Sequence, residues 1–219
     1  MRDSSRRCHM SAATPILVTI RHFAAALVVA AVIGMPGAAT AQLYATPVTD
    51  PDKLYRLEGF TLTPPRGEAW FEMKRDEREV YFGKRLPSPT HSFIAVAVIL
   101  TVTAEVDSAE AWRDYVVRQM TNTTADPRNR ILLMAADVDP AAGPLCVRYQ
   151  MRVEDQGAAY ARGRTLLVET TGLNCLHPGR RNLAIDMSFT ERGLPDQFGS
   201  ALRGEGERFL ASLKILPQP

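Results

Sequence analysis

The chain has 219 residues, 46% of them hydrophobic and 23% charged, and its formal net charge is +2. A chain of this length can form one domain with a substantial core. A net charge so close to zero gives no electrostatic reason to expect nucleic acid as a partner, and it excludes the strongly basic class of binding proteins.

The N-terminal end of the chain has the composition of a secretory signal peptide. An uncharged run of 13 residues spans positions 23–35, and the small-x-small sequence Ala39-Thr40-Ala41 follows it before Gln42. Basic residues precede the run, among them Arg6, Arg7 and Arg21. The run is shorter than the about 20 residues that a membrane span needs. These features predict a signal peptide over residues 1–41 that is removed by cleavage.

Two alternatives at this end of the chain stay open. The segment could be kept as an uncleaved membrane anchor, and translation could start at Met10 instead of Met1. Cleavage after Ala41 leaves 178 residues with 22 basic and 23 acidic side chains, a net charge of −1. No other hydrophobic run is long enough to cross a membrane. The prediction is therefore a periplasmic or secreted protein of the bacterial envelope, with no membrane span after cleavage.

The mature chain is predicted to form one domain after a short lead-in. Residues 42–56 are polar and contain prolines, which predicts a loosely ordered lead-in. Residues 57–215 are predicted to form a single α+β domain. Its expected strands follow in chain order at 57–62, 69–74, 78–82, 92–103, 131–138, 145–154, 165–171 and 183–190. Apolar residues at helical spacing predict a helix over 108–121, with Trp112 as a core anchor, and a second helix near the C-terminus, where Pro195 suits a first helical turn.

The strongest strand signal lies in the stretch 92–103, which is apolar on both faces. A continuous apolar run of this length is typical of a central strand that is covered on both sides. This stretch therefore predicts layers above and below the sheet.

Cleavage of the signal peptide would leave Cys146 and Cys175 as the two cysteines of the mature chain. In an oxidising compartment, the simplest state of a lone pair is a disulfide. The bond would close a loop of about 30 residues and stabilise the fold by ~3 kcal/mol. Two separate thiols are the alternative.

A turn is expected over residues 172–179, because Gly172, Asn174, Pro178 and Gly179 are turn formers. This places Cys175 and His177 on a connection, where binding residues are common. A thiol enzyme with Cys175 as nucleophile and His177 as base is one hypothesis for this turn. A metal site that adds His91 to these two residues lacks the second spaced ligand pair that structural zinc sites show. The sequence therefore predicts neither a metal nor a cofactor.

A ligand-binding patch is a further candidate, and it would use basic residues around the same turn. Its members are His177, Arg180, Arg181, Arg162 and Arg164. Such arginines could hold an anion, although most residues of this kind form a solvated face.

Several short motifs resemble the PsbP/Mog1-like superfamily. They are the sequence GFTLTPP at 59–65, the helix after the long strand, and the closing sequence FLASLK at 209–214. The sequence CLHP at 175–178, followed by MSFTERG at 187–193, also resembles uncharacterised exported bacterial proteins. The resemblance implies a mainly antiparallel sheet covered by helices on both faces, an α/β/α sandwich. It implies binding or assembly roles more than catalysis, and it supplies no catalytic residue.

The sequence thus favours an exported, non-enzymatic binding or assembly protein whose partner is a protein or a small ligand in the cell envelope. No phosphate-binding glycine loop, nucleophile elbow or zinc-protease helix is present in the sequence. The alternatives are an envelope thiol enzyme that uses Cys175 and His177, and a carrier of small anions.

Overall fold

The structure is a computed structural model that describes residues 45–161 and 163–216 of the chain. The predicted signal peptide, its cleavage site and Arg162 lie outside the described residues. Within the described ranges, no helix is long and apolar enough to cross a membrane.

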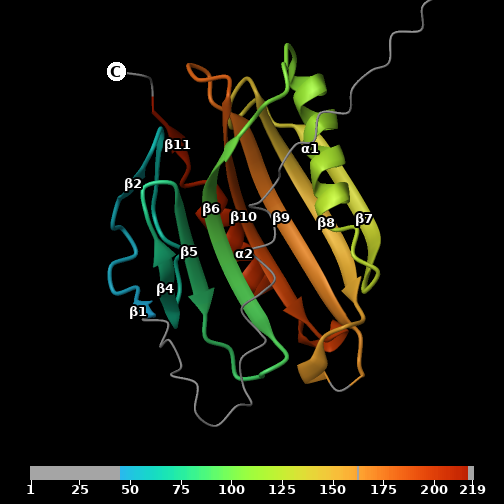
Figure 1. Cartoon of the computed structure of the whole chain (residues 1–219). Coiled ribbons are helices and arrows are strands. Elements are labelled where there is room, and N and C mark those ends of the chain that lie inside the picture. The colour runs from blue at the N-terminus through green and yellow to red at the C-terminus, as the bar shows by residue number, and fades with distance from the viewer. Residues whose placement is uncertain (1–44, 162, 217–219) are drawn as a thin grey trace, which may run out of the picture. The chain divides into compact units, whose positions relative to one another are not determined.

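Two sheets and two α-helices make up the described part of the chain (Figure 1). The main sheet has eight strands in the order β1-β4-β5-β6-β10-β9-β8-β7, and all neighbouring strands are antiparallel. These strands are β1 (Thr46–Pro47), β4 (Trp70–Arg75), β5 (Glu79–Lys84), β6 (Ser92–Thr101), β7 (Asn129–Val138), β8 (Cys146–Asp155), β9 (Leu166–Leu176) and β10 (Leu183–Gly193). The helices are α1 (Ala109–Thr123) and α2 (Ser200–Leu210). The chain therefore has the α+β fold with a mainly antiparallel sheet that the sequence predicts.

The small sheet corrects the prediction of a single strand over 57–62. These residues belong to a hairpin of β2 (Tyr55–Leu57) and β3 (Phe60–Leu62), and β11 (Lys214–Ile215) pairs with the other side of β3. Gly59 forms the hairpin turn with φ at +84°, a conformation that glycine adopts without a Cβ clash. Strand β1 and the start of β2 also lie within the expected lead-in, so part of that segment is ordered by strand pairing.

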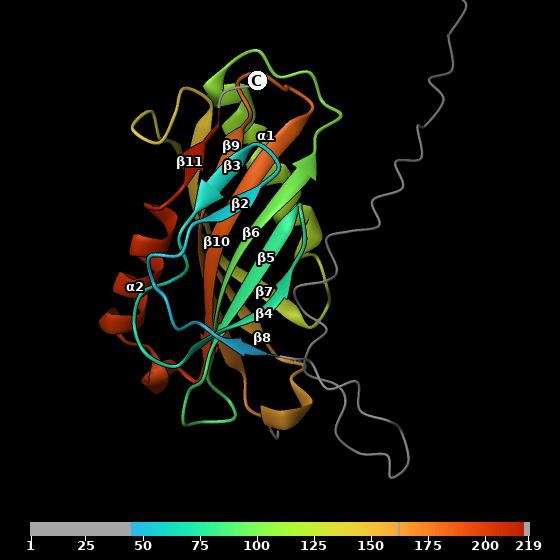
Figure 2. The same cartoon turned by 90° about the vertical axis from the view of Figure 1, so that its left-hand side faces the viewer.

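The largest hydrophobic cluster joins the main sheet to the small sheet and to α2. Figure 2 labels these elements. The cluster includes Ile185 and Met187 of β10, Phe60 of β3 and Phe209 of α2, and each of these side chains is almost fully buried. This face of β10 is the apolar face that alternation in the sequence predicts. The closing helix begins at Ser200, because Pro195 lies instead in a separate single-turn 3₁₀ helix over Pro195–Gln197.

Strand β6 is central, between β5 and β10, but its two faces are not buried equally. Phe93 and Ala95 point into the large cluster and are buried, whereas the alternating residues Ile94 and Val96 stay half-exposed. The sequence predicted cover on both faces of this strand. The difference arises because helix α1 packs mainly against β7 and β8 and leaves this part of the sheet less covered.

Helix α1 begins as the sequence predicts, with the Ser108 side chain accepting a hydrogen bond from the backbone N–H of Ala111. Trp112 and Val116 pack in a second cluster with Ala184 of β10. The Nε1–H group of Trp112 donates to the backbone oxygen of Asn174 at 3.1 Å. Trp112 is therefore the core anchor that the sequence predicts.

Candidate functional site

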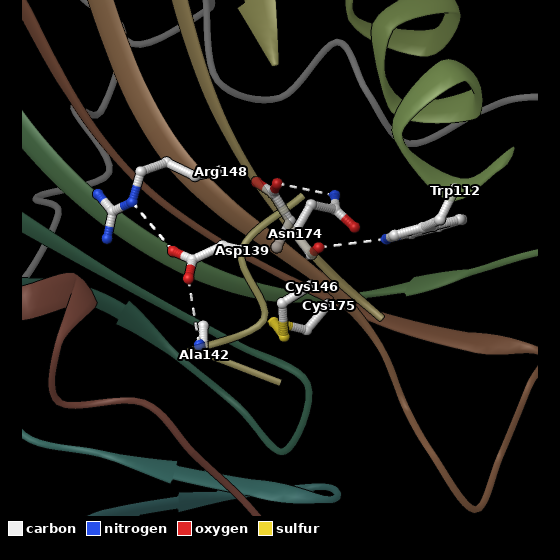
Figure 3. The surroundings of a disulfide bond; sticks show 8 residues. Trp112, Asp139, Ala142, Cys146, Arg148, Asn174 and Cys175 are labelled. Atoms are coloured by element: carbon white, nitrogen blue, oxygen red, sulfur yellow. Dashed lines mark hydrogen bonds and ion pairs between the residues drawn. A yellow bond between two sulfur atoms is a disulfide. The ribbon is translucent and has the colours of Figure 1, made fainter. Parts of the chain in front are cut away.

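The disulfide between Cys146 and Cys175 is present, and it joins directly opposite residues of β8 and β9 (Figure 3). Both residues are buried, with 1% and 0% exposure. Asp139 stands beside the bond and receives hydrogen bonds from Arg148 Nε and from the backbone N–H of Ala142, both at 3.2 Å. The cystine therefore holds two neighbouring strands together.

Cys175 lies within a strand, which corrects the prediction of a turn over 172–179. Strand β9 runs to Leu176, and the turn to β10 covers only 177–182. Two of the four expected turn formers, Gly172 and Asn174, lie in the strand and have other roles. A Cβ on Gly172 would lie 2.3 Å from Tyr149 Cζ, so glycine makes room for that ring. The side chain of Asn174 donates a hydrogen bond to Asp186 at 2.9 Å.

His177 is 2% exposed, and its ring lies against Gly59 of the β2–β3 turn. Its Nδ1 atom accepts a hydrogen bond from the backbone N–H of Gly179 at 3.2 Å. The sulfur of Cys175 is bonded to Cys146, and Cys175 is 0% exposed. The pair expected for a thiol enzyme therefore has no free thiolate in this structure.

The arginines of the expected ligand patch are not gathered in one place. Arg180 forms an ion pair with Glu58 at 2.5 Å, and Arg181 Nη1 donates to the backbone oxygen of Val106 at 3.0 Å. Both arginines thus hold neighbouring loops against the β9–β10 turn. Arg164 precedes the opposite end of β9, an 11-residue strand that spans about 35 Å. The structure therefore places Arg164 far from Arg180 and Arg181, and it does not bring these three arginines together in one site.

A groove of about 420 Å³ lies beside the disulfide. Its lining is mainly apolar and comes from the 142–146 segment, the end of β9 and the C-terminal strand. The named residues are Ala142, Gly143, Pro144, Leu145, Cys146, Leu176, Pro178, Leu213, Lys214, Ile215 and Leu216. Lys214 is the one charged residue in this lining, so the groove has few groups that could orient a polar ligand.

A second cleft, of about 380 Å³, combines charged and apolar side chains. We call it the α2 cleft, because it opens at the start of helix α2. Its lining comes from β8, β9, β10 and the segment that leads into α2: Arg152, Leu167, Glu169, Glu191, Pro195, Phe198, Gly199, Ser200 and Arg203. This mixture of an apolar wall and a few convergent polar groups is typical of small-molecule sites.

Two arginines at the α2 cleft share one carboxylate. Arg152 of β8 and Arg203 of α2 both form ion pairs with Glu169 of β9, the second at 3.1 Å. The side chains of the arginines are 47% and 63% exposed, so their guanidinium groups keep contact with solvent. Guanidinium groups have five N–H donors each, and a single carboxylate leaves some of these donors open to a second acceptor.

A buried carboxyl group lies at the floor of the same cleft. Glu191 of β10 is 6% exposed, and it accepts a hydrogen bond from His91 Nε2 at 2.9 Å and another from the backbone N–H of Gly199. Burial raises the pKa of Glu191, whereas the hydrogen bond from His91 lowers it. The two hydrogen bonds give this buried carboxyl group a fixed orientation.

The wall that carries Phe198 is held by the side chain of Gln197. Its Oε1 atom accepts from the backbone N–H of Leu194 at 2.8 Å, and its Nε2 group donates to Ser88 Oγ at 2.9 Å. Thr90 Oγ1 also donates to Gln197 Oε1, at 3.3 Å. This network ties the approach to α2 to the loop before β6, so the cleft has a fixed wall.

Another buried polar cluster lies on the face of the sheet where α1 packs. Asp186 accepts hydrogen bonds from Tyr149 Oη at 3.1 Å and from Asn174 Nδ2 at 2.9 Å. Burial raises the pKa of Asp186 to about 6, against the lowering effect of these two hydrogen bonds. Burial and the charge of Asp186 also raise the pKa of Tyr149 well above its usual value. Among the described residues, Asn174 Oδ1 has no hydrogen-bond partner.

Sequence reasoning did not find the α2 cleft, because its charged residues come from separate segments. One signal was nevertheless available. The apolar face of β10 alternates through Leu183, Ile185, Met187 and Phe189, and the next inward position is Glu191. A carboxyl group at an inward position requires a partner, and His91 provides it. Among residues 45–161 and 163–216, no three His, Cys, Asp or Glu side chains are grouped so that they could hold a metal ion.

Comparison with known proteins gives only distant similarity. No protein-family model and no curated protein sequence matches the chain. Among solved structures, LpqN of Mycobacterium tuberculosis, described as involved in cell envelope biogenesis, is 15% identical, with a TM-score of 0.47 and coverage of 79% of this chain and 91% of its own. A mutant of Mog1 is 10% identical, with a TM-score of 0.45 and coverage of 74% and 95%.

The Ran-binding protein Mog1p of Saccharomyces cerevisiae is also 10% identical, with a TM-score of 0.44 and coverage of 74% and 94%. Two of these three structures are thus Mog1 proteins. Because the identities are at most 15% and the TM-scores lie below 0.5, the functions of these proteins are not transferred to this chain.

Proposed function

We propose that this chain is an exported, non-enzymatic binding protein and that its ligand binds in the α2 cleft. The observation that carries the proposal is the arrangement of Arg152 and Arg203, which share Glu169 beside an apolar wall and keep part of their surface open to solvent. Export is supported by the signal-peptide pattern of residues 1–41 and by the cystine, which suits an oxidising compartment.

The chemistry of the α2 cleft suits a small amphipathic acid. An acidic group would bind between Arg152 and Arg203, and an apolar group would pack against Leu167 and Phe198. The carrier of small anions that the sequence suggested would thus use this cleft. The 177–182 turn is a poor alternative, because its arginines already bind Glu58 and a backbone oxygen.

We infer that the domain is an α/β/α sandwich with one helix on each face of the main sheet. Support comes from two adjacent residues of β10, which pack with different helices. Ala184 packs with Trp112 of α1, whereas Ile185 packs with Phe209 of α2. Neighbouring residues of a strand point to opposite faces. In this arrangement the small sheet shares the α2 face, and the α2 cleft opens at one end of that layer.

A non-enzymatic role is supported by the positions of Cys175 and His177, the two residues that a thiol enzyme would use. The alternative of an envelope enzyme requires a free Cys175, whose sulfur is bonded to Cys146. It also requires an imidazole within reach, but the His177 ring contacts Gly59 and the Gly179 backbone. Thiol-dependent turnover that is lost in Cys175→Ser would contradict the proposal.

Ligand binding is tested by calorimetry with a series of small aromatic and aliphatic carboxylic acids. Arg203→Gln and Arg152→Gln keep a polar, hydrogen-bonding side chain but shorten it and remove its charge, and each should weaken binding by about tenfold or more. The control is Arg113→Gln on α1, whose arginine is also exposed and forms an ion pair only with its neighbour Asp114. Binding that is equal in all four proteins, or absent throughout the series, would contradict this site.

Export is tested separately from binding. We expect the protein from the envelope fraction to begin at Gln42, as N-terminal sequencing or intact mass would show. A full-length chain that remains in the cytosol with reduced cysteines would contradict export, whatever the result of the binding experiment.

A further inference from the structure

We propose that two copies of this chain associate through strand β7, so that their main sheets join into one continuous antiparallel sheet. The strand lies at the outer edge of the main sheet, and within the described part of the chain it pairs only with β8 (Figure 1). It is ten residues long, whereas β1 at the opposite edge has two. A long free edge exposes a row of backbone N–H and C=O groups that can pair with another strand.

The side chains of β7 do not protect this edge. Three large hydrophobic side chains are exposed in the described part of the chain, and two of them, Leu132 and Leu133, lie on β7 with 43% and 45% exposure. Leu132 occupies a bulge between Ile131 and Leu133, and it is the strand's one residue without a partner on β8. Free edges are usually protected by lysine, proline, short length or a β-bulge, and of these features β7 has only the bulge at Leu132.

The charges of β7 favour a second copy over other partners. Nine residues of the strand pair with residues of β8. Counted along the chain, Arg130 is the second of the nine, Met134 is the fifth and central one, and Asp137 is the eighth. Two such strands that run antiparallel about an axis at Met134 therefore place Arg130 of each copy opposite Asp137 of the other. The strand is complementary to itself, as a two-fold interface requires.

The two charged side chains also lie on the same face of the sheet. In the register of β7 with β8, Arg130 lies opposite Glu154 and Asp137 lies opposite Arg148. Positions 154 and 148 are an even number of residues apart, so their side chains, and those of Arg130 and Asp137, share one face of the sheet. Opposite charges that face each other across strands stabilise the pair, whereas like charges destabilise it. Asp137 is exposed and takes part in none of the ion pairs found among the described residues, so it is available to a second copy. Arg130 already forms an ion pair with Glu154, but its side chain is 63% exposed, and a guanidinium group can bind a second acceptor.

The first experiment measures the mass of the full chain in solution as a function of concentration, by sedimentation equilibrium. We expect a reversible monomer–dimer equilibrium. Leu133→Lys places a charge on the edge and should raise the dimer dissociation constant by about tenfold or more. The control Leu54→Lys changes the third exposed hydrophobic residue, which is off the edge, and should leave the constant unchanged. A strictly monomeric wild type, or a dimer unaffected by Leu133→Lys, would overturn the proposal.

The second experiment uses charge exchange between copies. Arg130→Asp places only acidic residues at these two positions, and Asp137→Arg places only basic ones, so each variant should dimerise more weakly than the wild type by about tenfold or more. An equimolar mixture of the two variants restores both Arg–Asp contacts and should form a mixed dimer. Circular dichroism would confirm that each variant is folded. A mixture that stays as weakly associated as its components would overturn the two-fold pairing.

Discussion

Asp186 and Glu191 both lie on β10, but they point to opposite faces of the sheet, and both are 6% exposed. Each is oriented by polar partners, Asp186 by Tyr149 and Asn174, and Glu191 by His91. Burial raises the pKa of both groups. A buried carboxylate is costly even with partners, so each of these residues makes the stability of the fold depend on pH.

We predict that Asp186 makes the protein less stable as the pH rises. Its pKa is raised from 3.8 to about 6, so the folded state holds more protons than the unfolded state between these values. The free energy of unfolding therefore falls as pH rises through this window, by about 3 kcal/mol for this group alone. Asp186→Asn should lack this fall and gain stability relative to the wild type from pH 4 to pH 7.

Urea unfolding at several pH values measures the difference between the two proteins. Asp114→Asn, at an exposed position of α1, is the control and should run parallel to the wild type. A difference between Asp186→Asn and the wild type that does not change with pH would contradict the prediction.

At the level of strands and turns, β9 differs most from expectation. Its glycine and asparagine suggested a turn at residues where the strand in fact continues, because Gly172 accommodates the Tyr149 ring and Asn174 binds Asp186. Both reasons depend on residues distant in sequence. Turn propensity is a local signal, and in this strand tertiary contacts override it.

The disulfide between β8 and β9 should stabilise the fold by about 3 kcal/mol, since it closes a loop with a sequence separation of 29 residues. Cys146→Ala/Cys175→Ala should lower the free energy of unfolding by this amount. Added reductant should lower the melting temperature of the wild type and leave that of the double variant unchanged. A melting temperature of the wild type that does not respond to reductant would show that the bond is absent in solution.

In the molecule as a whole, helix α2 connects the two sheets. Phe209 packs in the large cluster, and Glu205 contacts strands β4 and β5 of the main sheet. Trp70 Nε1 donates to Glu205 Oε2 at 2.7 Å, and Lys84 Nζ lies 2.8 Å from the same atom. The side chain of Glu205 is only 15% exposed. This contact joins the last helix to β4 and β5, which lie more than 100 residues earlier in the sequence.

Glu205→Gln should destabilise the protein by about 1–3 kcal/mol, because Lys84 would keep a buried charge without its partner. The matched control is Glu207→Gln on the same helix. Its side chain is 43% exposed and pairs with Arg148, so its loss should cost about 0–1 kcal/mol. Urea unfolding followed by tryptophan fluorescence compares the two variants. Equal effects at the two positions would contradict the role given to Glu205.

Local patterns in the sequence were sufficient for the fold class, for most strand and helix positions, and for the choice of Trp112 as a core residue. Alternation, helical spacing and capping act between residues close in the chain, so they can be read without knowledge of the fold. The signal peptide remains a prediction of the same kind, because residues 1–41 lie outside the described part of the chain.

The candidate site could not be found in this way. Arg152, Glu169 and Arg203 meet only because β8, β9 and α2 are brought together by strand order and by packing of the closing helix. Arg164 and Arg180 are close in sequence, but a whole strand separates them in space. Strand order and helix packing are set by contacts between distant segments, and these contacts leave no periodic trace in a single sequence.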